Sequence, residues 1–132
     1  MMIEPNPRSV KVVLVGALAL ISSPEAWCQE VSAQTASGGK THTTSNTAAK
    51  WCAVGAVWKS VEDNFPEKGV EAQEAGNWAL RFLEKTMTGK ITMDKKKFWS
   101  NESVSNVLEY NDSHTHAQVV GSFEKAIAKI TV

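Results

Sequence analysis

The chain has 132 residues, enough for one domain that buries a core without metal or disulfide staples. Its 14 basic and 14 acidic residues cancel, which argues against nucleic acid or an anionic membrane as a partner. Hydrophobic residues make up 42% of the chain and charged residues 21%, the proportions of an ordinary soluble protein. We expect most of its five tryptophans to lie in the core.

The apolar segment at residues 12–21 allows two interpretations. Arg8 and Lys11 precede it and small residues follow it, as in a secretory signal peptide. Its ten residues are too few to span a bilayer, which takes about 20. Alternatively, apolar residues recur at helical spacing over residues 10–21, and Pro24 would stop such a helix. The pattern alone does not decide between an exported protein and one with a buried first helix.

Residues 49–61 predict the central helix of the domain. One apolar face of this helix contains Trp51, Val54, Trp58 and Val61. Small residues cover the rest, and a helix that is apolar almost all round is normally buried. Asn46 or Thr47 is expected to cap it, which places Cys52 in mid-helix.

Two irregular segments and two further helices are predicted around this centre. The polar stretch at residues 32–47 is typical of a loop or a short hairpin. A third helix opens at Pro66 and ends at Gly89. An irregular segment follows at residues 88–99, and then a short helix capped by Ser100.

The last part of the chain combines turn residues with a helix start. The stretch from Tyr110 to His114 has the composition of a turn, because Asn and Asp side chains satisfy nearby amides. Thr115 and Gln118 fit a capping box, and an amphipathic final helix follows. Polar side chains therefore gather at a helix N-terminus, where free amides favour an anion.

Three sequence blocks in fixed order resemble a known family. The blocks are Ala17–Ile21 running into Pro24–Gln29, then Trp51–Ala56, then Tyr110–Asp112 leading to His114–Val119. Together they resemble the bacterial and phage proteins of domain-of-unknown-function family 6197, over roughly residues 10–128. The resemblance to the family does not extend to residues 86–101, where this chain carries extra residues. It implies a compact, mainly helical domain that keeps residues 17–28 in its mature form, and it implies no activity.

The hypotheses that the protein is an enzyme or binds a metal both depend on its cysteines and histidines. Cys28, Cys52, His114 and His116 are zinc-ligand types, but their spacing matches no compact ligand motif. Cys52 with His114 and Asp112 could form a nucleophilic set, yet a thiol buried in mid-helix is inert. A disulfide between the two cysteines requires export, so free buried thiols are expected. We expect no catalytic residue, no metal and no cofactor.

The sequence thus predicts a mainly α, single compact domain of about five helices spanning residues 1–132. The ordered core is expected to run over about residues 8–130, with residues 1–7 flexible. The preferred function is a small non-enzymatic interaction domain in the cytoplasm, with a protein as the expected partner. Export is the alternative if residues 1–26 act as a signal peptide.

Two sets of residues are candidate sites. The predicted ligand site contains Trp51, Cys52, Asn111, Asp112 and His114. The predicted interaction patch contains Lys95, Lys96, Lys97, Phe98 and Trp99. Turn and cap structure would explain the polar residues of the first set equally well. The alternative function is an enzyme or metal-binding protein that uses Cys52, Asp112 and His114.

Overall fold

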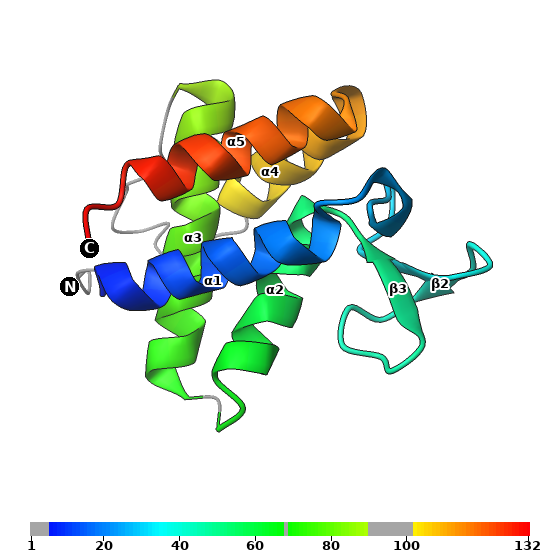
Figure 1. Cartoon of the computed structure of the whole chain (residues 1–132), viewed down its shortest axis with the longest axis horizontal. Helices are drawn as coiled ribbons and strands as arrows, with labels where there is room; N and C mark the ends of the chain where they lie inside the picture. Colours follow the sequence, from blue (N-terminus) through cyan, green and yellow to red (C-terminus); the bar gives the residue numbers. More distant parts are fainter. Residues whose placement is uncertain (1–5, 68, 90–101) are drawn as a thin grey trace.

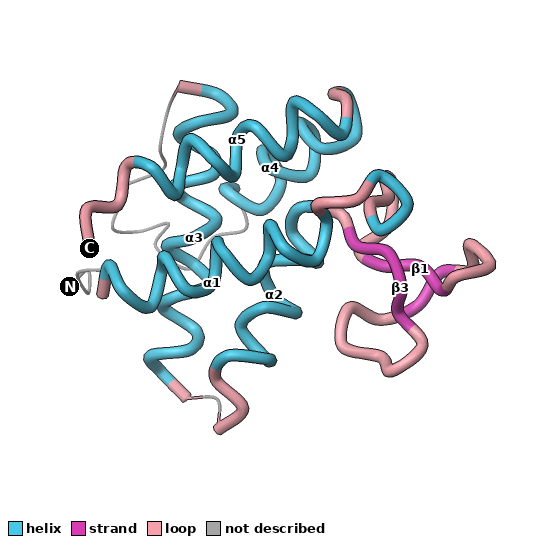
Figure 2. The backbone as a smooth tube through the Cα atoms, viewed as in Figure 1, coloured by secondary structure: helices cyan, strands magenta, loops and turns pink. Residues whose placement is uncertain are grey.

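The computed structural model describes residues 6–67, 69–89 and 102–132. In chain order, their elements are α1 (Pro7–Ile21), the 3-10 turn η1 (Pro24–Ala26), β1 (Ala33–Thr35), β2 (Lys40–Thr41), β3 (Ala48–Trp51), α2 (Ala53–Asn64), α3 (Val70–Thr88), α4 (Glu102–Ser113) and α5 (His116–Ala128). Helices dominate, and the small sheet lies at one end of the helical body (Figures 1 and 2). The predicted mainly α fold is confirmed.

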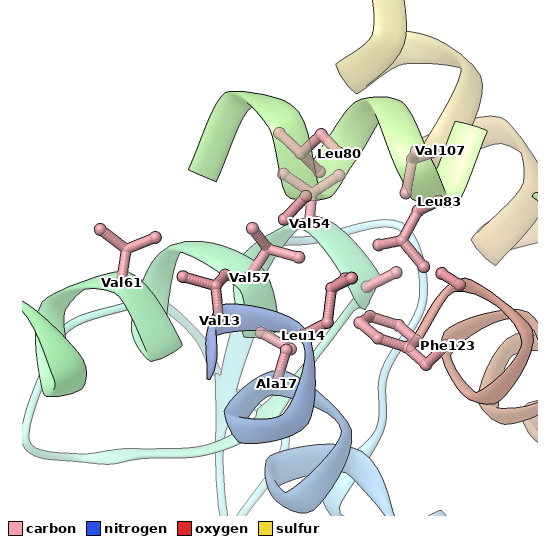
Figure 3. Close-up of a cluster of buried hydrophobic side chains, with 14 of the residues drawn as sticks. Val13, Leu14, Ala17, Val54, Val57, Val61, Leu80, Leu83, Val107 and Phe123 are labelled. Carbon is pink, nitrogen blue, oxygen red and sulfur yellow. The ribbon is translucent and has the colours of Figure 1, made fainter. Parts of the chain in front are cut away.

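The core forms where the five helices meet. Figure 3 shows side chains from every helix pointing toward one another, with Leu14 of α1 and Phe123 of α5 near the centre. Both side chains are fully buried. The buried face of α1 contains Val10, Val13, Leu14, Ala17 and Ile21. The predicted N-terminal helix is therefore present, and it packs most extensively against α2. Within the described ranges, no helix is long and apolar enough to cross a bilayer.

The start of α1 lies within the segment expected to be flexible. The Asn6 side chain accepts hydrogen bonds from the amides of Arg8 and Ser9, and Pro7 occupies the first helical position. An Asn cap followed by proline is a strong helix start, because the Asn side chain accepts from free N-terminal amides and proline has no amide N–H that needs a partner. Residues 1–5 lie outside the described residues.

The central helix begins later than its periodicity predicts. Residues 48–51 form β3, which pairs antiparallel with β1, so Asn46 and Thr47 are not its caps. Cys52 has an extended backbone and is the N-cap of α2, where its sulfur accepts a hydrogen bond from the Gly55 amide. The prediction that Cys52 lies in mid-helix is wrong, because short apolar runs fit a strand as well as a helix.

Gly55 lets the first turn of α2 lie directly against the chain before β1. A Cβ atom added at this residue would collide with the carbonyl oxygen of Ser32, which is backbone and cannot swing away. The same carbonyl accepts a hydrogen bond from the Cys52 amide at 3.1 Å. A side chain at position 55 would therefore push the helix from the sheet.

Gly55→Ala is expected to lower the free energy of unfolding by about 1–3 kcal/mol, the usual cost of overpacking. The matched control is Gly121→Ala in α5, where an added Cβ meets nothing within 4 Å. Alanine is the better helix former there, so this variant should gain about 0.5–1 kcal/mol. Urea unfolding of both variants measures the difference, and shifts of the same sign would contradict the close approach at Gly55.

The segment at residues 32–47 contains the predicted hairpin. β1 pairs antiparallel with β2, with Ala33 opposite Thr41, and the strand order in the sheet is β2-β1-β3. A separate parallel bridge joins Trp27 to Trp51. The sheet therefore carries the chain after α1 to the beginning of α2.

Helix ends in the second half agree with the predictions only in part. α3 starts at Val70 rather than at Pro66, and it ends as predicted at Gly89, whose φ of 80° favours glycine. Thr88 belongs to α3, and the remainder of the irregular segment, residues 90–99, lies outside the described residues together with Ser100.

The turn predicted from Tyr110 to His114 is largely wrong, because α4 continues through Ser113. The capping box of the final helix is confirmed, with Thr115 and Gln118 bonding each other's backbone amides. Asn111 and Asp112 therefore sit in the last turn of a helix. Their side chains bond to other segments of the chain, which removes the reason for a local turn.

Candidate functional site

The side chain of Asn111 joins three segments that are far apart in sequence. It is fully buried in the last turn of α4. Its Oδ1 accepts hydrogen bonds from the Trp27 indole at 2.8 Å and from the Ala53 amide at 2.9 Å. Its Nδ2 donates to the Cys28 carbonyl and to Asp112 Oδ1, both at 3.1 Å. These four bonds use the full capacity of a carboxamide. We call these four neighbours and Asn111 the Asn111 joint.

Gln29, and Glu30 through Asp112, connect the joint to further residues on its exposed side. The Gln29 amide nitrogen donates to the carbonyls of Asn111, Asp112 and His114 at 3.0, 3.3 and 3.2 Å. Carbonyls in the last turn of a helix lack helical partners, so Gln29 caps the end of α4. Asp112 Oδ1 accepts from the Glu30 amide at 2.8 Å, and Glu30 has a positive φ of 72°. These contacts hold the loop after η1 against α4 in a backbone conformation that non-glycine residues rarely adopt.

Most of the predicted ligand site surrounds this joint. Trp51 and Cys52 directly precede Ala53, but their polar groups bond within the chain: the Trp51 indole donates to the Thr43 carbonyl at 3.0 Å, and the Cys52 sulfur accepts from Gly55. Asn111 has no bonding capacity left over. The arrangement supports a structural role for these residues, and the ligand site stays a prediction.

Both cysteines are free and buried, as predicted. Burial raises the pKa of the Cys28 thiol to about 12, with a smaller contribution from the neighbouring Cys52. Burial also raises the pKa of Cys52, although two helix-start amides oppose the shift. Position at a helix start normally activates a thiol, but here burial outweighs that effect. Neither cysteine has the character of a nucleophile.

Native protein is therefore expected to react with iodoacetamide far more slowly than urea-unfolded protein. Raising the pH from 7 to about 9 should speed alkylation of the unfolded chain, because thiolate is the reacting form. The native chain should change little over this range, since the pKa of Cys28 lies near 12. Mass spectrometry after timed alkylation measures both rates. Rapid labelling of Cys52 in folded protein would revive the nucleophile hypothesis.

His114 lines a separate pocket of about 260 Å³. Its ring stacks on that of Tyr110, with centroids 3.6 Å apart and planes 9° apart. His116 lies elsewhere, with Nε2 2.6 Å from the Ile21 carbonyl oxygen. Among the residues described, no group of three His, Cys, Asp or Glu side chains could hold a metal ion. The two histidines, which the sequence analysis considered as zinc-ligand types, therefore lie in different parts of the structure.

A groove along the outer side of α1 was missed by the sequence analysis. Its volume is about 690 Å³, and it is lined by Arg8, Lys11, Val12, Val15, Gly16, Asn64 and Val132. Val12 and Val15 do not share the helical spacing of the buried residues of α1. This difference in spacing could have identified them from the sequence as apolar residues on the exposed face. We call this feature the α1 groove. The predicted patch of Lys95, Lys96, Lys97, Phe98 and Trp99 lies outside the described residues.

Comparison with known families gives a match that covers most of the chain. A family model described as "Family of unknown function (DUF6197)" matches residues 5–129. No curated protein and no solved structure matches the chain. The matched range includes all three sequence blocks, which the fold brings together around Asn111.

Proposed function

The chain belongs to the family of unknown function DUF6197, and from its own surfaces we propose that it is a small non-enzymatic binding domain. The observation that carries this proposal is the α1 groove. We propose that the groove binds an amphipathic, acidic helical segment of another protein. A protein partner is also what the sequence predicts, but the proposed binding site lies on α1 and not at residues 95–99.

Exposed apolar side chains gather in this groove. Val12, Val15 and Val132 are 44%, 47% and 54% exposed, and all three line it. Contiguous exposed apolar surface commonly marks an interaction site. The groove runs along a helix already fixed by its buried face, so a partner would meet a preformed surface. Preformed surfaces bind better because little ordering is required on association.

The charges of the α1 groove favour an acidic partner. Its lining contains two cationic residues, Arg8 and Lys11, and no acidic residue. Lys11 Nζ donates to the main-chain oxygen of Val132 at 2.8 Å, whereas the Arg8 guanidinium has no hydrogen-bond or ion-pair partner among the described residues. An apolar stripe next to cations is complementary to a helix that presents apolar anchors beside Asp or Glu.

A cytoplasmic location is part of this proposal. Removal of residues 1–26 as a signal peptide would delete α1, and with it one wall of the core and the groove itself. The alternative, chemistry by Cys52, Asp112 and His114, has less support. The Cys52 thiol is buried, and burial raises its pKa. His114 lines a pocket whose wall contains neither Cys52 nor Asp112.

Selection from a library of random helix-length peptides tests the proposal. We expect the selected peptides to share apolar residues at helical spacing together with Asp or Glu. Their affinity should fall with added salt, because screening weakens the contribution of Arg8 and Lys11. Val15→Asp should abolish binding, because it places an anion in the apolar floor next to the acidic peptide.

The matched control is Val70→Asp at the start of α3. Val70 is 69% exposed and does not line the α1 groove. This variant should bind the selected peptides like the unaltered protein, and both variants should unfold at similar urea concentrations. Equal binding by Val15→Asp, or selected peptides without acidic residues, would refute the proposed partner.

A further inference from the structure

We propose that the pocket beside His114 binds a guanidinium group. The pocket lies between the end of α3 and the last turns of α4, and its wall is formed by Met87, Thr88, Asn106, Glu109, Tyr110, Ser113 and His114. It shares no lining residue with the α1 groove, so the two sites are tested independently. Three side chains of this wall, those of Asn106, Glu109 and His114, present hydrogen-bond acceptors.

The hydrogen bonds of His114 determine which ring nitrogen is left to bind a ligand. Its Nδ1 lies 2.9 Å from the Tyr110 carbonyl oxygen, which can only accept a hydrogen bond. Nδ1 therefore carries the proton. The Ser113 hydroxyl, 2.9 Å away, donates to the Glu109 carbonyl and leaves a lone pair toward Nδ1. In the neutral ring Nε2 then holds the free lone pair and is an acceptor.

Asn106 and Glu109 add two further acceptors. Asn106 Nδ2 donates to the buried carboxylate of Glu84 at 2.6 Å, and Oδ1 of the same amide accepts no hydrogen bond from the described residues. The carboxylate of Glu109 is exposed and forms no ion pair or side-chain hydrogen bond with the described residues. An anionic carboxylate beside two neutral acceptors favours a cation that donates several hydrogen bonds.

Size and shape favour guanidinium over other cations. The volume of about 260 Å³ lies just below the range of about 300–1,000 Å³ that is typical of drug-sized ligands. A side-chain-sized group therefore suits it. Guanidinium is planar, carries five N–H donors and stacks on aromatic rings, which the Tyr110–His114 pair provides. The group could come from a free small cation or from an arginine side chain of another protein.

Titration of the full ¹⁵N-labelled chain followed by NMR tests this inference. The probes are methylguanidinium chloride, N-acetyl-arginine-N-methylamide and, as a cation without N–H donors, tetramethylammonium chloride. We expect saturable shifts for amides at Asn106, Glu109 and His114 with the first two probes only. Tighter binding of the capped arginine would indicate an arginine side chain as the source, whereas equal binding would indicate a free cation.

Glu109→Gln should weaken guanidinium binding by about tenfold or more, because it removes the charge and keeps the shape. Glu124→Gln is the matched control, an exposed carboxylate on α5 that does not line the pocket. Both changes are on the surface and should leave the unfolding midpoint in urea unchanged. Shifts that never saturate, an equal response to tetramethylammonium, or unaltered binding by Glu109→Gln would overturn the inference.

Discussion

Asn111→Ala is expected to lower the free energy of unfolding by about 3–5 kcal/mol, because it leaves several buried polar groups without partners. The Ala53 amide loses its acceptor and the Cys28 carbonyl loses a donor. The Trp27 indole N–H also loses its acceptor. Each unsatisfied buried group costs about 1–3 kcal/mol, and a cavity remains where the carboxamide was.

Urea unfolding followed by circular dichroism measures this loss. Asn46→Ala is the matched control, since Asn46 is exposed in the loop between β2 and β3. Its effect should stay within about 0.5 kcal/mol. Asn111→Asp should also be strongly destabilised, because it replaces the Nδ2 donor and buries a charge next to Asp112. A loss below about 1 kcal/mol in Asn111→Ala would contradict the role of the joint.

Phe123→Ala is expected to cost about 3–5 kcal/mol, the usual effect of removing a buried phenylalanine. The ring is fully buried where the five helices meet (Figure 3). Few side chains can collapse into the space, because Leu14 and its neighbours are themselves held by other helices. The loss should therefore fall at the upper end of that range.

The control for this substitution is Val70→Ala, which removes an apolar side chain that is 69% exposed. It should change the free energy of unfolding by less than about 0.5 kcal/mol. Thermal and urea unfolding of both variants provide the comparison. If Phe123→Ala behaved like the surface control, the last helix would not complete the core.

Features set by local sequence were predicted correctly. The capping box of Thr115 and Gln118 and the helix stop at Gly89 each depend on a few neighbouring residues. The buried stripes of α1 and α5 follow from helical spacing alone. Such signals need no knowledge of where the rest of the chain lies.

Features that depend on distant segments were missed. Residues 48–51 form a strand because β1 is beside them, and no local signal distinguishes this from a helix. Asn111 and Asp112 were read as turn residues, although their side chains bond to residues more than 50 positions away. The family resemblance grouped the three blocks, but only the fold shows that Asn111 connects them. The α1 groove was missed because single exposed valines are common on helices.

Hydrogen exchange at the Ala53 amide tests the central claim, that Asn111 locks the start of α2 to the two other blocks. The first amides of a helix have no partner within the helix and ordinarily exchange quickly. The Ala53 amide is instead bonded to the buried Asn111 side chain at 2.9 Å. We predict that it exchanges only through global unfolding, with an opening free energy equal to that from urea unfolding. Exchange at the rate of a solvent-exposed amide would contradict the claim.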